Sequence, residues 1–219
     1  DAISKVDTEI NYTQANNNAI NRHPSAITYI TRQNEGAITP GDVIGIGETE
    51  SFFVISSDDA KTIILSEYCI DENENQVSDA SYKKINFAQE NYWSGKVGDG
   101  LQYSGRLKNS TSPVYHSKYY PYVYDENSYL KPYVDAYGRK IGNSGLTVLN
   151  SRLLNYYEKD KLTNAQLAIP NQHYWLGSAY SSNSIFMTYD SGYVNGADVP
   201  VSWRLGIRPV IEVPTSELN

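Results

Sequence analysis

The chain has 219 residues, of which 18 are basic and 25 acidic, so its formal net charge is -7. Hydrophobic residues make up 40% of the chain, which excludes wholesale disorder and suits one large domain with its own core. The acidic balance disfavours nucleic acid and anionic membrane surfaces as partners, because both attract clustered Lys and Arg. No apolar run approaches the ~18 residues that a membrane span needs. The single cysteine, Cys69, excludes a disulfide framework.

Tyrosine is unusually frequent, with 20 residues, and Asn and Ser are also abundant. Tyrosine offers amphipathic contact area at a low entropic cost, and Ser and Asn offer adaptable hydrogen bonds. The composition therefore favours a binding surface.

The first 26 residues are interpreted as an N-terminal helix or linker that precedes a domain at 27–219. Ile3, Val6 and Ile10 have the spacing of a short amphipathic helix. A frayed linker to an upstream domain is an equally good interpretation. Because the chain starts at Asp1, we expect that a signal peptide, an anchor or a pilin-like helix preceded it.

Strands are predicted next, in the part of the chain that begins at Ile27. Apolar alternation and short apolar runs, separated by turn residues at 39–42 and 58–61, place them at 27–31, 43–46, 52–55 and 62–65. The last two form a predicted β-hairpin. Residues 71–120 are polar and are predicted to be mainly loop.

Two helices follow in the prediction. An apolar stripe at helical spacing defines the first, with Pro132 in its first turn and Gly142 as its stop. The stripe consists of Leu130, Tyr133, Val134, Tyr137 and Ile141. The second helix is predicted to begin at Asn155, since Glu158 three residues later completes a capping box. Residues 146–154 between them alternate like a strand.

The C-terminal third is predicted to be β-structure. Strands are expected at 174–175, 185–189 and 193–194, with a tight turn at 190–192, and an alternating final strand at 205–211. A hairpin, two helices and a β-meander in this order indicate the α+β class.

Catalytic and metal-binding motifs are not found in the sequence. The histidines His23, His116 and His173 lack ligand spacing, and the acidic stretch 71–75 is interpreted as a solvated turn. Cys69 is interpreted as a small buried residue. We therefore expect no enzyme activity, no metal and no cofactor, with an enzyme whose groups meet only on folding as an alternative.

Several segments resemble formylglycine-generating-enzyme-like domains, in an uncharacterised subgroup of Gram-positive bacterial and phage surface proteins. Residues 151–158 resemble the family's strand-to-helix element, and 174–180 with 205–211 resemble its closing "W-x-x-S … G-x-R-P" segment. Four shorter stretches, at 39–42, 53–56, 92–95 and 122–125, extend the resemblance over about 27–213.

The resemblance implies a C-type-lectin-like fold, with a mixed, twisted antiparallel sheet and two main helices. It also implies that the stretch before the "G-x-R-P" strand lies on the ligand face. The chain departs from the family because the oxidase members use a cysteine pair, and only Cys69 is present. It also lacks the Glu-Pro-Asn and Trp-Asn-Asp signatures of calcium-dependent sugar binding, and fold alone does not give function.

Residues 180–204 combine aromatic side chains with Ser, Asn and Asp, which suits recognition of a sugar, a peptide or a protein surface. The predicted ligand-binding residues are Tyr180, Asn183, Tyr189, Tyr193, Asn195 and Trp203, with Trp175 beneath them as a support. The alternative is that these aromatic residues pair across strands for stability alone. Arg208, Gly206 and Arg152, with the Asn155 and Glu158 cap, are predicted to be structural.

Together these features predict a non-enzymatic, extracellular binding or adhesion domain. The expected partner is a glycan or protein on a host or bacterial surface, without membrane contact by the chain itself. The main alternative is a pilin-like subunit that associates with its own copies.

Overall fold

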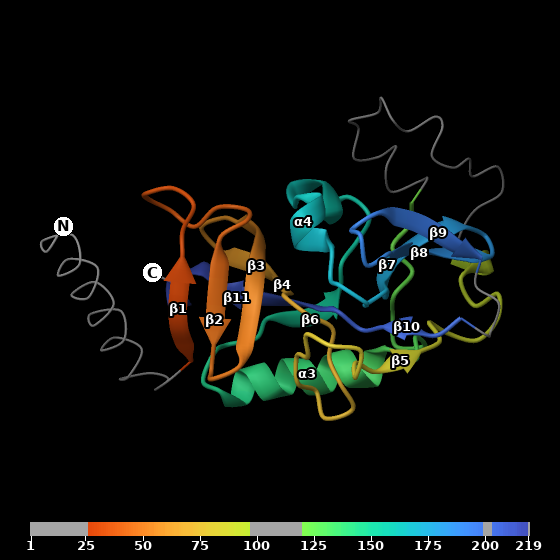
Figure 1. Ribbon diagram of the computed structural model, residues 1–219, viewed down its shortest axis with the longest axis horizontal. Helices are drawn as coiled ribbons and strands as arrows, with labels where there is room; N and C mark the ends of the chain where they lie inside the picture. The colour runs from red at the N-terminus through yellow and green to blue at the C-terminus, as the bar shows by residue number, and fades with distance from the viewer. Residues whose placement is uncertain (1–25, 97–119, 199–202, 219) are drawn as a thin grey trace, which may run out of the picture.

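The computed structural model describes residues 26–96, 120–198 and 203–218, and in these ranges the chain forms two β-sheets and two α-helices (Figure 1). The strands are β1 (Ile27–Thr31), β2 (Val43–Ile46), β3 (Glu50–Ser57), β4 (Lys61–Ser66), β5 (Lys84–Ile85), β6 (Asn150–Leu153), β7 (Tyr174–Ser181), β8 (Ser184–Thr188), β9 (Val194–Asp198), β10 (Leu205–Gly206) and β11 (Pro209–Pro214). The helices are α3 (Lys131–Asn143) and α4 (Asn164–Leu167), and 3-10 turns occupy Ser94–Lys96, Glu158–Lys161 and Thr215–Glu217. The predicted α+β class is confirmed. The N-terminal helix predicted around Ile3, Val6 and Ile10 lies outside the described residues.

The larger sheet has six strands in the order β1-β2-β3-β4-β11-β6, and each neighbouring pair is antiparallel. The predicted hairpin is confirmed as β3 and β4. Its turn forms because the Asp58 carboxylate accepts hydrogen bonds from the backbone N–H groups of Ala60 and Lys61, both at 2.8 Å.

The smaller sheet has five strands in the order β5-β10-β7-β8-β9. Strands β7, β8 and β9 form an antiparallel meander, as predicted, whereas β10 runs parallel to β7. Strand β5 was not predicted, because its two residues lie in a polar stretch that carries no strand-like pattern. In Figure 1 the meander and the β1–β4 part of the larger sheet lie at opposite ends of the molecule.

The prediction of one continuous final strand at 205–211 was wrong. The chain pairs with β5 and β7 up to Gly206 and then, from Pro209, pairs with β4 and β6 in the other sheet. Between these strands the carbonyl of Ile207 accepts a hydrogen bond from the backbone N–H of Ile70. The alternation itself continues through the break, so that the sequence pattern gave no sign of the change of sheet.

The prediction of a helix that begins at Asn155 was also wrong, although its cap exists. The Asn155 carboxamide accepts hydrogen bonds from the backbone of Tyr157 and Glu158, and Glu158 accepts one from the backbone of Asn155. Arg152 also binds both oxygens of the Glu158 carboxylate. The cap leads only into the 3-10 turn, and α4 begins later behind a second capping box formed by Thr163 with Gln166.

The first helix is confirmed, with Pro132 in its first turn. It continues one residue past the predicted stop at Gly142. Gly145, with a φ of 109°, adopts the left-handed conformation just after the helix ends.

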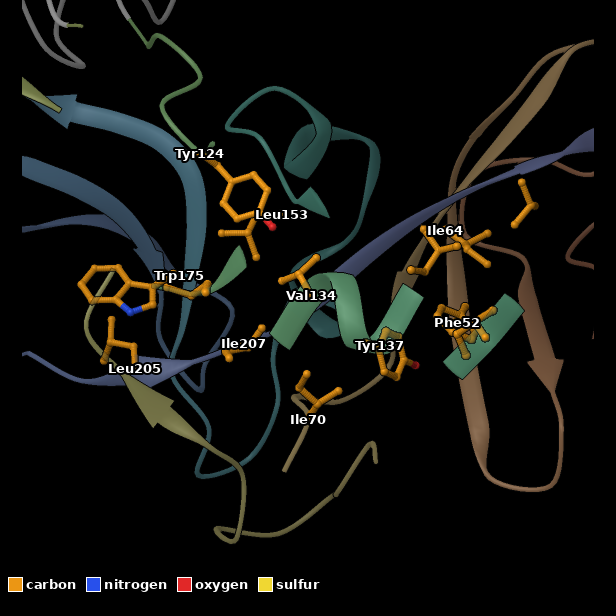
Figure 2. Close-up of a cluster of buried hydrophobic side chains, with 14 of the residues drawn as sticks. Phe52, Ile64, Ile70, Tyr124, Val134, Tyr137, Leu153, Trp175, Leu205 and Ile207 are labelled. Atoms are coloured by element: carbon orange, nitrogen blue, oxygen red, sulfur yellow. The ribbon is translucent and has the colours of Figure 1, made fainter. Parts of the chain in front are cut away.

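Helix α3 joins the two halves of the main hydrophobic core. Figure 2 shows Val134 and Tyr137 of this helix between Phe52 of the larger sheet and Trp175 of the smaller one. A second core cluster contains Tyr174, Leu176 and Phe186. Successive residues of β7 therefore enter different clusters, as expected for a strand whose two faces are both covered.

Arg208 is 1% exposed and lies where the chain crosses between the sheets. Its Nε and Nη atoms donate five hydrogen bonds of 2.7–3.0 Å. The acceptors are the carbonyl oxygens of Ser66, Glu67, Gln166 and Leu167 and the hydroxyl of Tyr174. These bonds agree with the predicted structural role of Arg208, because the guanidinium connects the ends of β4 and α4 with β7.

We predict that Arg208→Ala lowers the free energy of unfolding by about 3 kcal/mol or more, because several buried acceptors lose their donor at once. Arg208→Lys should also destabilise the protein, since an ammonium group cannot reproduce the planar array of five donors. Urea unfolding measures both changes. The exposed Arg139 supplies the control, and an Arg208→Ala variant as stable as Arg139→Ala would contradict the assignment.

Arg152 of β6 takes part in a partly buried network of ion pairs. It donates to Glu158 and, through Nε, to Glu212 at 2.9 Å, and Lys61 contacts the other oxygen of Glu212 at 2.9 Å. Burial acts to raise the pKa of Glu212, but the hydrogen bonds from Lys61 and Arg152 outweigh it, so this pKa lies below its ordinary value.

A lowered folded-state pKa means that Glu212 contributes stability above its unfolded pKa, near 4.5, and loses it as the pH falls through the folded value. We therefore predict that Glu212→Gln lowers stability at neutral pH and makes it less dependent on pH in the acid range. Thermal unfolding at a series of pH values measures this. Glu126→Gln, at an exposed position, should leave the acid dependence unchanged.

Candidate functional site

The β7–β8–β9 meander carries most of the predicted ligand-binding residues, but it presents them on two faces. Tyr180 packs against the cluster that contains Phe186, whereas Tyr189 packs against the cluster that contains Met187. Asn195 pairs with Met187 in the β8–β9 register and so lies on the same face as Tyr189. The structure therefore does not unite all of these side chains in one surface.

Trp175, predicted as a support beneath the ligand-binding residues, is a residue of β7 and belongs to the main core cluster. It is fully buried, its indole N–H donates to the carbonyl of Ile85 at 2.8 Å, and its ring meets Phe87 edge-on with centroids 5.9 Å apart. These contacts fix β7 against β5, so Trp175 supports the meander from inside the core.

The turn between β8 and β9 brings together Tyr189, Tyr193 and His173, which we call the tyrosine turn. The rings of Tyr189 and Tyr193 are stacked, with centroids 6.1 Å apart and an interplanar angle of 20°. His173 meets Tyr189 edge-on at 5.6 Å. Tyr193 is 62% exposed, which leaves much of its side chain open to a ligand.

The backbone of the tyrosine turn is held in place by Gly192. Its φ is 82°, and a Cβ atom there would lie 2.3 Å from the carbonyl oxygen of Asn164 in α4. The backbone N–H of Tyr189 donates to the carbonyl of Tyr193 at 2.9 Å. The turn is thus a fixed platform, packed against α4.

Asn183 and Trp203 lie away from the tyrosine turn. Asn183 is exposed in the β7–β8 turn, at the opposite end of β8, where its side-chain oxygen accepts a hydrogen bond from Ser181. Trp203 is 41% exposed, and its carbonyl accepts a hydrogen bond from Asn86 beside β5. The Asn195 carboxamide binds the adjacent backbone N–H of Gly196.

Tyr180 belongs to a second aromatic group, which we call the tyrosine cluster. Ring centroids 4.2–6.0 Å apart connect its members, which are Tyr120, Tyr156, Tyr157, Tyr180 and Phe186. The ammonium of Lys159 lies 4.4 Å above the Tyr156 ring. Tyr120, Tyr156 and Tyr157 were not among the predicted residues, because they come from two segments far from 180–204. The adjacent tyrosines at 156 and 157 were the one sequence signal for this group.

The Tyr180 ring reaches across β8 to cover Gly196 on β9. A Cβ atom at Gly196 would lie 2.2 Å from the Tyr180 ring, so only glycine fits beneath it. The ring also meets Phe186 edge-on at 5.1 Å. For Tyr180 this contact supports the alternative in which aromatic residues pair across strands for stability.

In the described part of the chain, few groups are candidates for catalytic chemistry. Cys69 is fully buried, as predicted, and burial raises the pKa of its thiol to about 12, so it stays protonated at neutral pH. Within the described ranges, no three His, Cys, Asp or Glu side chains come together as a metal site would require. His23 and His116 lie outside these ranges.

Comparisons with protein-family models, with curated proteins and with solved structures find no match to this chain. None of the helices in the described part of the chain has the length and apolar character that a membrane span requires.

We predict that Gly196→Ala destabilises the protein by about 1–3 kcal/mol, because its methyl group would collide with the Tyr180 ring. In the Tyr180→Ala background the same change should be close to neutral, since the obstructing ring is absent. A double-mutant cycle by urea unfolding measures the coupling. An equal cost of Gly196→Ala in both backgrounds would show that the ring does not occupy this place.

Proposed function

We propose that this chain is a non-enzymatic, extracellular recognition domain with a C-type-lectin-like fold, and that it binds a surface glycan or protein through the tyrosine turn. One observation carries the proposal: a stacked pair of tyrosines on a rigid turn, of which Tyr193 is 62% exposed. An exposed aromatic ring with a hydroxyl group is amphipathic, so that it suits both the apolar face and the hydroxyl groups of a sugar.

Rigidity of the turn favours binding as well. Because Gly192 and the Tyr189–Tyr193 hydrogen bond already fix the backbone, a ligand loses little of its binding energy to ordering the site. Asp190 follows Tyr189 directly in the sequence and Asn195 lies two residues after Tyr193, and both are proposed to offer hydrogen-bonding groups to the ligand.

The motif resemblance supports the fold part of the proposal. The segment that resembles the "G-x-R-P" element contains Gly206 and Arg208, and both are tightly packed: a Cβ atom at Gly206 would lie 2.8 Å from Cys69 Sγ. The segment that resembles the strand-to-helix element contains the Arg152–Glu158 ion pair. Binding is proposed to be independent of calcium, since the calcium-ligand signatures of the lectins are missing from the sequence.

A self-associating, pilin-like subunit is the second candidate. Among the described strands, β1 and β6 form the two edges of the six-stranded sheet, and edge strands can pair with another chain. Sedimentation of the protein over a range of concentrations tests this candidate.

We predict that the purified protein binds a subset of ligands on a glycan and cell-surface array, equally in calcium and in EDTA. Tyr193→Ala and Tyr189→Ala should each weaken binding at least ~10-fold, the loss expected for an aromatic anchor, without a large change in melting temperature. Trp203→Ala, changed separately, tests whether this distant residue belongs to the same surface.

Tyr129→Ala is the matched control, because Tyr129 is 46% exposed and lies outside the meander. Equal binding by Tyr129→Ala and Tyr193→Ala would contradict a role for the tyrosine turn. No binding to any ligand on the array, combined with concentration-dependent association, would favour the pilin-like subunit.

A further inference from the structure

Lys140, near the C-terminal end of α3, has its ammonium group enclosed by three oxygen atoms from other parts of the fold. Its Nζ lies 2.6 Å from Glu50 Oε1, 2.8 Å from Asn75 Oδ1 and 2.8 Å from the carbonyl oxygen of Glu74. One amine therefore contacts both a carboxamide and a carboxyl group that come from other parts of the sequence.

The carboxyl group is buried and held in one orientation. The Glu50 side chain is 5% exposed, and Tyr137 donates its hydroxyl hydrogen to Glu50 Oε2 at 2.6 Å. Gln76 in turn donates to the Tyr137 hydroxyl at 2.8 Å and to the carbonyl of Ser51 at 2.9 Å. Oε1 is thereby left directed at Lys140.

The backbone that carries the Asn75 carboxamide is ordered by its own turn. The backbone N–H groups of Asn73 and Asn75 both donate to Asp71 Oδ1, and Glu74 adopts a φ of 55°. The acidic stretch 71–75 is thus an ordered turn that presents Asn75 to the helix.

We propose that Lys140 and Asn75 form an intramolecular amide cross-link between Nζ and the side-chain carbonyl carbon, with release of ammonia. A carboxamide is a poor electrophile in solution. Holding the amine against it at contact distance makes the reaction intramolecular, and the buried Glu50 carboxyl group, which contacts the amine, can move the required protons.

The step balances without a co-reactant. The Lys140 ammonium passes one proton to Glu50 Oε1, and the neutral amine attacks the Asn75 carbonyl carbon, whose π electrons move to Oδ1. Glu50 then gives its proton to the amide nitrogen, which leaves as ammonia when the C–N bond breaks. The second proton of the attacking nitrogen passes through Glu50 to the ammonia, so that an ammonium ion leaves and Glu50 is again a carboxylate.

An ordinary ion pair between Lys140 and Glu50 is the competing interpretation, and mass spectrometry separates the two. The folded full chain should be lighter than its sequence predicts by the mass of one ammonia molecule. A tryptic digest should contain one branched peptide that joins the Asn75 and Lys140 segments, because trypsin does not cleave after an acylated lysine.

Three variants test the assigned roles. Lys140→Arg and Asn75→Ala remove the reacting groups, and Glu50→Gln removes the proton carrier, so each should have the full sequence mass. Asn73→Ala, at the exposed neighbouring asparagine of the same turn, should retain the mass loss. Melting temperatures show whether each variant is folded, and the branched peptide from the unaltered chain decides the question even where a variant is not.

Several outcomes would overturn the proposal. The unaltered protein could keep its full sequence mass after prolonged incubation at neutral pH. The ammonia loss could survive in Lys140→Arg, which would assign it to cyclisation of an asparagine. Loss of a water molecule instead would place the bond between Lys140 and Glu50.

Discussion

The fold depends on the buried guanidinium of Arg208. Its donors satisfy carbonyl groups at the end of β4 and at the C-terminal end of α4, together with the Tyr174 hydroxyl in β7. None of these acceptors is a carboxylate, so the positive charge is balanced by oriented backbone dipoles, among them the negative end of a helix. Because a planar guanidinium allows little variation in the positions of its acceptors, it fixes how the two sheets and α4 meet.

Two hydrophobic clusters of different composition make up the core. The cluster around α3 spans both sheets and contains the larger set of buried apolar side chains. Figure 2 shows Val134 and Tyr137 of α3 within it. The cluster on the other side of β7 is rich in tyrosine, with rings that contact one another. In it the Tyr174 hydroxyl donates to the carbonyl oxygen of Leu167 and accepts a hydrogen bond from Arg208. The tyrosines of this chain therefore serve both core packing and the surface. Composition does not distinguish the two roles, whereas burial does: Tyr174 is buried and Tyr193 is exposed.

The sequence predicts the local elements well, because hydrophobic period and turn residues act over short distances. The β3–β4 hairpin, helix α3 and the β7–β9 meander all have such signals. Prediction from the sequence fails where a residue distant in the chain determines the local structure. Arg208 binds Ser66 of β4 at the point where the chain passes between the sheets, and Arg152 binds Glu158 at the cap that is followed by a 3-10 turn. The candidate site shows the same division. The aromatic and polar stretch 180–204 contains Tyr189 and Tyr193 of the tyrosine turn. Residue spacing does not predict that Tyr180 lies on the other face of the sheet, nor that Lys140 contacts Asn75.

The strand order has a consequence for how the chain folds. Strand β11, almost the last segment of the sequence, lies inside the larger sheet between β4 and β6. Because β11 follows both of its neighbours in the chain, β4 and β6 cannot be joined into one sheet until β11 has been synthesised. Long-range pairings of this kind slow folding and expose unpaired edges meanwhile. Premature termination a few residues before β11 would therefore leave both the sheet and its core incomplete.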